Sequence, residues 1–162
     1  MRTLTSRVAA ALALLVAVPF LLTGCQRGPT VQPDGAKKEV VDVVDRTTET
    51  LGGKWTVRRG PALGKCPASA GTGGVTWTYI LDRDQVGDQT ADRAAVQELW
   101  GSSGITASDY ESGGADPLRG VVGHGGPTWS VEFLTRSDGY TVHGVSRCAD
   151  GNYEDMLRHG EG

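Results

Sequence analysis

The chain has 162 residues, and its 16 Lys and Arg against 19 Asp and Glu give a formal net charge of −3 at pH 7. That length suits one domain with a hydrophobic core rather than two. Since neither the net charge nor any block of charge is positive, the composition excludes nucleic acid as an expected partner.

The most specific motif lies near the N-terminus, at Leu22-Thr23-Gly24-Cys25. A branched apolar residue, two small residues and a thiol in this order resemble the lipobox of bacterial lipoprotein signals. The resemblance implies a diacylglyceryl thioether on Cys25 and cleavage just before it. Because two acyl chains hold a protein stably on a bilayer, this modification would anchor the mature protein to the outer face of the cell membrane.

The residues before this motif are typical of a signal peptide. Arg2 and Arg7 give a positive start, and residues 8–22 form an uncharged run of 15 positions. A spanning helix needs roughly 20 apolar residues, so the run is too short for one. We therefore expect a signal peptide at 1–24, whose removal leaves 138 residues and, without the two arginines, a net charge of −5. Ordinary secretion with cleavage nearby and an uncleaved anchor remain alternatives.

Two cysteines remain after lipidation, Cys66 and Cys148, and the signal directs them to an oxidising compartment. We expect them to form a disulfide, with two buried free thiols as the alternative. Their separation of 82 residues resembles no pair of metal ligands. We therefore expect neither a metal site nor a cofactor.

The two ends of the mature chain lack the pattern of packed structure. Residues 25–35 are polar and hold two prolines, so we expect a lipidated flexible tether. Residues 151–162 are acidic and poor in apolar side chains, which predicts a frayed tail. A single domain is expected between them, at 36–150.

Apolar spacing predicts two helices, at 36–51 and 90–100. Asp34 is the expected N-cap of the first, and glycine-rich stretches follow both. The apolar residues that define the first helix are Val40, Val41, Val44 and Leu51.

Alternation of apolar and polar residues predicts six strands. They are expected at 54–58, 75–81, 105–110, 118–123, 129–134 and 140–147, with a hairpin turn at 137–139 between the last two. The stretch 60–74 is rich in Gly, Pro, Ala and Ser and is expected to be a long loop. In the first strand, Trp55 and Val57 are expected to point into the core.

The predicted order is α-β-β-α-β-β-β-β. Two helices cannot cover both faces of such a sheet, so we predict an α+β fold: a two-layer sandwich whose antiparallel sheet of four to six strands carries two helices on one face. We expect a monomer. The tryptophans fall on inward stripes and are expected in the core rather than in a carbohydrate platform: Trp55, Trp77, Trp100 and Trp129.

Five features span nearly all of the mature chain: the lipobox, WTVRRGP at 55–61, Cys66 after a glycine-bearing loop, TWTY at 76–79 and GVSRC at 144–148. Together they resemble the small cell-envelope lipoproteins of actinobacteria, including the LppA-like group. Most such proteins have no assigned activity. The resemblance therefore implies an anchored envelope protein and brings no catalytic residues with it.

Three stretches suggest chemistry but lack residues that it needs. The HGG sequence at 124–126 is similar to the oxyanion loop of lipases and esterases, yet the chain has no Gly-x-Ser-x-Gly elbow. Residues 82–93 begin like a calcium loop, but Val86 and Arg93 stand at two ligand positions. Residues 60–65 are one residue short of a phosphate loop. We therefore expect no catalytic residue, and keep a hydrolase of an envelope ester or glycan as the alternative.

The sheet face without helices is expected to carry hydroxyl and charged side chains. A solvated face is the simplest interpretation. A contact with an envelope protein or glycan is the sharper hypothesis, since such groups can form charge-assisted hydrogen bonds. We therefore predict a non-enzymatic, membrane-tethered lipoprotein that binds or supports an envelope partner. The candidate contact residues are Arg58, Thr76, Thr78, Glu132 and His143, with Thr56, Ser130 and Thr141 beside them.

Overall fold

A computed structural model describes residues 31–67, 73–115 and 117–160. The predicted signal peptide, the lipidation site Cys25 and most of the tether lie outside these residues. Among the helices that the structure describes, none is both long and apolar enough to cross a membrane.

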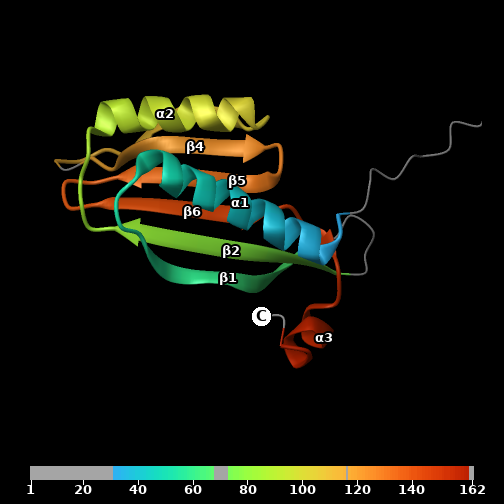
Figure 1. Ribbon diagram of the computed structural model, residues 1–162. Helices are drawn as coiled ribbons and strands as arrows, with labels where there is room; N and C mark the ends of the chain where they lie inside the picture. Colours follow the sequence, from blue (N-terminus) through green and yellow to red (C-terminus); the bar gives the residue numbers. More distant parts are fainter. Residues whose placement is uncertain (1–30, 68–72, 116, 161–162) are drawn as a thin grey trace, which may run out of the picture.

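The fold is α+β, with two helices packed on one face of an open antiparallel sheet, as the sequence predicts (Figure 1). In the described residues the sheet has seven strands in the order β1-β2-β6-β5-β4-β3, and the short β7 pairs with β2. The elements are α1 (Pro33–Leu51), β1 (Thr56–Cys66), β2 (Gly74–Arg83), α2 (Gln89–Ser102), β3 (Thr106–Glu111), β4 (Arg119–Gly125), β5 (Thr128–Thr135), β6 (Tyr140–Ser146), β7 (Ala149–Asp150) and α3 (Tyr153–Arg158).

Glycines in the sheet allow the helices to approach it closely. A Cβ atom at Gly144 of β6 would lie 2.7 Å from a methyl carbon of Val40 and of Val44, both fully buried in α1. The indole Nε1 of Trp100 in α2 donates a hydrogen bond to the Thr47 hydroxyl of α1 at 2.9 Å. The helices are thus fixed to the sheet by apolar packing and to each other by a buried hydrogen bond.

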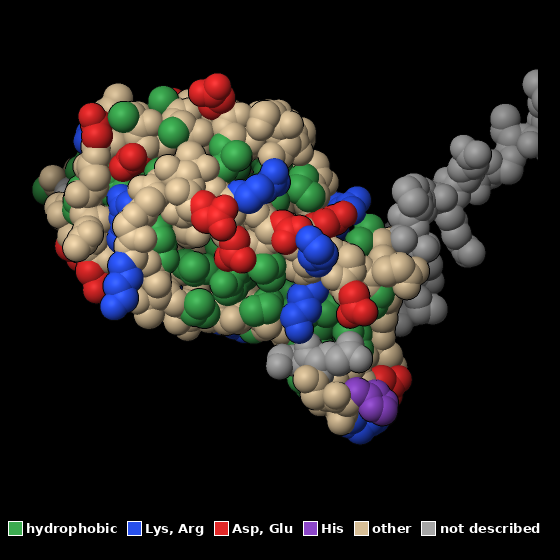
Figure 2. All heavy atoms as spheres, in the orientation of Figure 1, with side chains coloured by type: hydrophobic (Ala, Val, Ile, Leu, Met, Phe, Trp, Pro, Cys, Tyr) green, Lys and Arg blue, Asp and Glu red, His purple; other side chains and the backbone are tan. Residues whose placement is uncertain are grey.

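The outer surface of the helical layer is charged, with both signs mixed (Figure 2). Lys38 and Asp42 of α1 form one exposed ion pair there. Mixed charges on the solvent side of an amphipathic helix agree with its predicted orientation.

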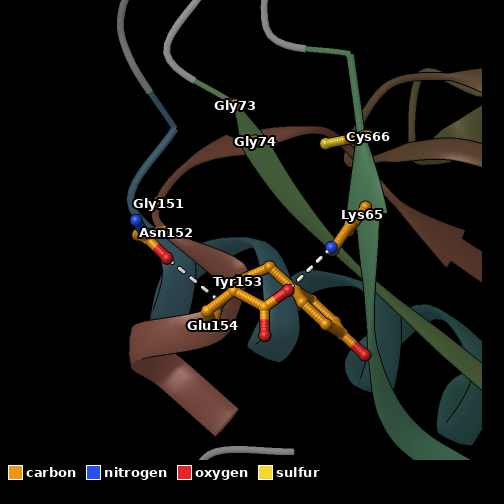
Figure 3. A pocket seen from close by; sticks show the side chains of 8 residues that line it. All are labelled: Lys65, Cys66, Gly73, Gly74, Gly151, Asn152, Tyr153 and Glu154. Atoms are coloured by element: carbon orange, nitrogen blue, oxygen red, sulfur yellow. Dashed lines mark hydrogen bonds and ion pairs between the residues drawn. The ribbon is translucent and has the colours of Figure 1, made fainter. Parts of the chain in front are cut away.

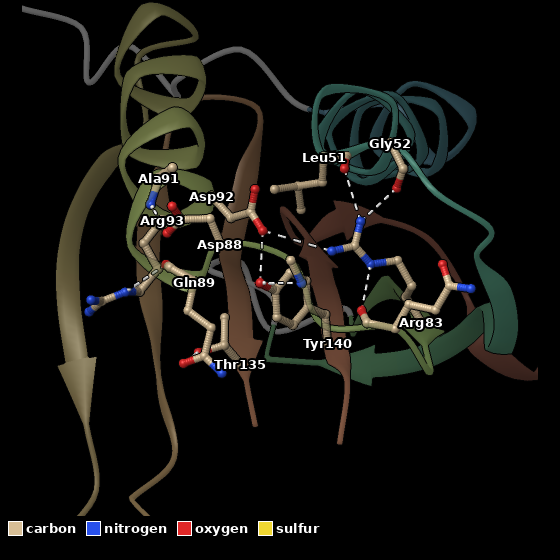
Figure 4. Close-up of polar contacts among 12 residues, drawn as sticks. Leu51, Gly52, Arg83, Asp88, Gln89, Ala91, Asp92, Arg93, Thr135 and Tyr140 are labelled. Carbon is tan, nitrogen blue, oxygen red and sulfur yellow. Dashed lines mark hydrogen bonds and ion pairs between the residues drawn. The ribbon is translucent and has the colours of Figure 1, made fainter. Parts of the chain in front are cut away.

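A buried arginine joins four elements at one end of the sheet (Figure 4). The Arg83 side chain is 6% exposed. Its Nη1 donates to the carbonyl oxygens of Leu51 at 2.9 Å and Gly52 at 2.8 Å, at the C-terminus of α1, and its Nε donates to the carbonyl oxygen of Gln85 at 3.0 Å. Its Nη2 lies 3.8 Å from Oδ2 of Asp92 in α2. We call this the Arg83 end of the domain.

The same network keeps the hydroxyl of Tyr140, the first residue of β6, in its protonated form. The Tyr140 hydroxyl donates to Oδ2 of Asp92 at 2.7 Å and accepts from the Gly87 amide at 3.0 Å. Burial, with the hydrogen bond to Asp92, raises the pKa of Tyr140 to about 12. The guanidinium of Arg83 lies 4.4 Å from the ring centre of Tyr140, a distance at which a cation and a ring attract each other.

The predicted loop at 60–74 is wrong over its first half, because β1 continues to Cys66. The register between β1 and β2 shifts twice, between Val57 and Arg59 and between Arg59 and Ala62. These irregularities interrupt the alternation that the sequence pattern assumes. Val57 precedes both shifts and pairs with the buried Leu81, so it keeps the predicted side of the sheet, but on the edge strand β1 it is 51% exposed.

Both ends of the predicted domain also differ in detail. Helix α1 begins at Pro33, and its N-cap is Gln32 without a side-chain hydrogen bond, so the prediction of Asp34 as the cap is wrong. Between residues 149 and 160 the chain forms β7 and α3 rather than a frayed tail. The Asn152 side chain caps α3, and Met156 is 9% exposed among apolar residues of α1, β1 and β2.

Candidate functional site

The residues predicted as a contact surface lie on the sheet face that α1 and α2 leave uncovered. The register places His143 opposite Glu132 and Thr78 opposite Val145. Residues paired in this way point to the same side of the sheet. Val131, which precedes Glu132, is fully buried on the other side, so Glu132 and His143 share the uncovered face with polar and apolar residues alike. The apolar residues in register with this face are Ile80, Val122, Leu134 and Val145.

Arg58 reaches this face from the edge strand β1. Its Nε lies 3.3 Å from Oδ2 of Asp82, and the Thr141 hydroxyl donates to the other carboxylate oxygen at 2.8 Å. The Arg58 side chain is 51% exposed, and such a pair contributes at most about 1 kcal/mol to stability. The Arg58 guanidinium is therefore held in place weakly and could exchange this partner for another anion or carbonyl.

Glu132 and His143 form the second polar pair. His143 Nδ1 lies 3.5 Å from Oε2 of Glu132, and both side chains remain partly exposed. Thr76 is engaged within the fold instead, because its hydroxyl donates to the Ser146 carbonyl at 3.0 Å. Of the predicted contact residues, Arg58 and Glu132 thus offer accessible charge, and His143 offers a partly exposed imidazole.

His124 does not form the arrangement that the hydrolase alternative requires. It lies on the same face, opposite Ser130 in the ladder, and is exposed. Across the residues that the structure describes, it makes no hydrogen bond or ion pair with a serine or a carboxylate. The same residues contain no group of three or more His, Cys, Asp or Glu side chains that could hold a metal ion.

The prediction that Trp129 belongs to the core is wrong, since this side chain is 70% exposed. The register of β5 with β6 passes from Thr128 directly to Ser130, and the register with β4 does the same, so Trp129 is the extra residue of a β-bulge. The bulge leaves Thr128 buried and turns Trp129 outward. Trp77 and Trp100 are 1% exposed, as predicted, and Trp55 is half-buried.

Trp129 borders a pocket of about 290 Å³ on the uncovered face. The Cys66–Cys148 disulfide, with an S–S distance of 2.00 Å, forms part of the wall. Pro67 and Val145 add further apolar surface. The exposed indole therefore belongs to an apolar patch and is not an isolated side chain.

A second pocket lies beside this one, between the last residues of β1, the first residue of β2 and the start of α3 (Figure 3). It measures about 250 Å³ and includes Gly74 and Asn152 in its lining. Lys65 crosses it to reach Oε1 of Glu154 at 2.8 Å and lies 4.7 Å from the ring centre of Tyr153. The charges at its mouth are therefore already paired.

Comparison with known proteins supports the fold and assigns no activity. No protein-family model matches the sequence, and no curated protein matches it. Among solved structures, the chain is similar to a DUF4853 family protein from Actinomyces odontolyticus ATCC 17982, with a TM-score of 0.58 and 18% identity over 78% of this chain and 72% of that one. This neighbour is an actinobacterial protein, and at that identity the similarity concerns the fold alone.

Proposed function

We propose that this protein is a lipid-anchored extracytoplasmic lipoprotein without catalytic activity, whose uncovered sheet face binds an envelope protein or glycan. The lipobox at 22–25 supports the anchor. The sequence motifs also support a place among the small actinobacterial envelope lipoproteins, the LppA-like group included.

The observation that carries the binding proposal is the state of the charged groups on the uncovered face. Arg58 and Glu132 are 51% and 40% exposed, and each has one partner on the sheet. A ligand carbonyl, hydroxyl or carboxylate could replace or extend these contacts with little loss, because exposed pairs are weak. Charge-assisted hydrogen bonds to a desolvated ligand are stronger.

The anchor is tested by changing Cys25 to Ala and fractionating cells. We expect the wild type in the membrane fraction and the variant in the medium. A variant that stays with the membrane would overturn the anchor.

The binding face is tested separately, by recovery of envelope components on the immobilised mature domain. The double variant Arg58→Ala, Glu132→Ala should lose a partner that the wild type retains. Glu111→Ala, Arg119→Ala is the matched control, because this exposed pair, 3.0 Å apart, lies on the edge hairpin β3–β4. Equal recovery by all three proteins would show that the uncovered face is only a scaffold.

A further inference from the structure

The chain enters the domain at the same end that exposes Trp129. The amide of Asp150 donates to the Val31 carbonyl at 3.4 Å, which joins the first described residue to β7. Strand β7 pairs with the start of β2 and directly follows Cys148 of the disulfide. We call this the disulfide end: residues 31–34, 65–67, 73–75, 128–129 and 146–158, opposite the Arg83 end (Figure 1).

The length of chain before Val31 fixes how far this end can lie from a lipid on Cys25. The two residues are six positions apart. A fully extended chain covers at most about 3.3–3.6 Å per residue, so six positions span roughly 20 Å. A domain held by Cys25 must therefore keep its disulfide end close to the headgroups.

The apolar side chains at the disulfide end are suited to contact with the headgroup region of the bilayer. Trp129 stands out of the sheet on its bulge beside Pro67 and the disulfide. Tryptophan is enriched at membrane–water interfaces, because its ring is apolar and its N–H still finds a polar partner. Leu157 of α3, which is 43% exposed, adds a second large apolar side chain at the same end.

Charge does not supply the attraction. The cations of this end are paired with carboxylates: Lys65 with Glu154, Arg147 with Glu39 at 2.7 Å, and Arg158 with Asp155. Anionic lipids bind clusters of unpaired Lys and Arg. The contact expected here is apolar and should not depend on anionic lipid.

We infer that the patch formed by Trp129, Pro67 and the Cys66–Cys148 disulfide rests on the lipid bilayer that carries the anchor, with the Trp129 indole in the interface. This inference rests on the proposed lipid anchor at Cys25. The short tether holds the patch near the bilayer at an effective concentration of about millimolar, so a weak contact is sufficient. The domain then stands on its disulfide end instead of tumbling on its tether.

The test attaches the mature chain to phosphatidylcholine vesicles through Cys25, using a maleimide lipid. Cys25 is the thiol left to react, since Cys66 and Cys148 are joined. Vesicles with brominated acyl chains quench indoles that enter the interface. The Trp129 emission is the difference between the spectra of the wild type and W129F. We expect this emission to shift to the blue on unbrominated vesicles and to be quenched on brominated ones.

A matched control moves the reporter to the opposite end. In the double variant W129F, V57W the new indole replaces an exposed residue that pairs with Leu81 near the end of β2. It should keep its emission in brominated vesicles. Phosphatidylserine added to the vesicles should leave the result for Trp129 unchanged.

Three results would overturn the inference. One is the absence of Trp129 quenching in brominated vesicles. This result overturns the inference whether the domain stays monomeric, associates with itself through the patch, or changes its emission when a soluble chitin oligosaccharide is added. Another is equal quenching of the indole at position 57, which would mean an unoriented domain. The third is quenching only with phosphatidylserine. Because the attachment is chemical, these results are independent of lipidation in cells and of partner recovery.

Discussion

Replacing Arg83 with Met should destabilise the domain by about 3–5 kcal/mol, the cost of breaking a buried charged contact by removing one partner. The change removes three hydrogen bonds from Arg83 to the carbonyls of Leu51, Gly52 and Gln85, and leaves Asp92 with the Tyr140 hydroxyl as its remaining close partner. Hydrogen bonds with a charged group contribute about 1.5–3 kcal/mol each, and the packing of the Met side chain offsets part of the loss. Since a domain is stable by only about 5–15 kcal/mol, the variant should be close to unfolding.

The measurement is equilibrium unfolding in urea with the disulfide intact, followed by tryptophan fluorescence. Arg58→Met is the control, because it removes the same side chain from an exposed pair and should cost no more than about 1 kcal/mol. Arg83→Lys should fall between the two, since one ammonium cannot reach the carbonyls and Asp92 as the planar guanidinium does. If Arg83→Met loses less than about 1 kcal/mol, the network does not hold α1, α2 and the sheet together.

Three further outcomes follow from the same contacts. Because the pKa of Tyr140 is raised from 10.0 to about 12, its contribution to stability is present below pH 10 and is lost as pH rises towards about 12. The urea concentration at the midpoint of unfolding should therefore fall over this pH range, and it should fall less in Tyr140→Phe. Gly144→Ala should cost about 1–3 kcal/mol by overpacking against α1, whereas Gly101→Ala, with nothing within 4 Å, should be neutral or stabilising in thermal unfolding. Reduction of Cys66–Cys148, which closes a loop of 82 residues, should cost at most about 4.5 kcal/mol, and an unchanged midpoint after reduction would contradict this.

The two layers of the fold could be predicted from the sequence, because the spacing of apolar residues indicates which face of a helix or strand is buried. In α2, Val96 and Trp100 recur four residues apart and are both buried. In β5, Val131 and Phe133 alternate with polar residues and are fully buried, and the predicted turn at 137–139 lies between β5 and β6. Such patterns depend on neighbours along the chain alone.

The features that were missed depend on contacts between distant residues. Trp129 continues the alternation of Val131 in the sequence, and only the pairing of β5 with both neighbours shows that a bulge reverses its direction. Met156 is the buried side chain of a six-residue helix whose apolar partners come from α1, β1 and β2. A prediction from the sequence pattern therefore places Trp129 in the core and expects a frayed tail. Neither the bulge nor the residues that pack on Met156 can be recognised from neighbouring positions in the sequence.

The Trp129 bulge and helix α3 lie at the disulfide end, whereas the register shifts of β1 lie beside Arg58. Places where a chain departs from local rules are where functional constraints are expected. If the disulfide end rests on the bilayer, the strands run away from it, and a strand of eight residues such as β5 reaches about 26 Å. Arg58, near the start of β1, then lies far from the lipid, with Glu132 and His143 at mid-height. The uncovered face would stand upright beside the membrane, open to a protein or glycan of the envelope, so the two surfaces can act together without competing for the same residues.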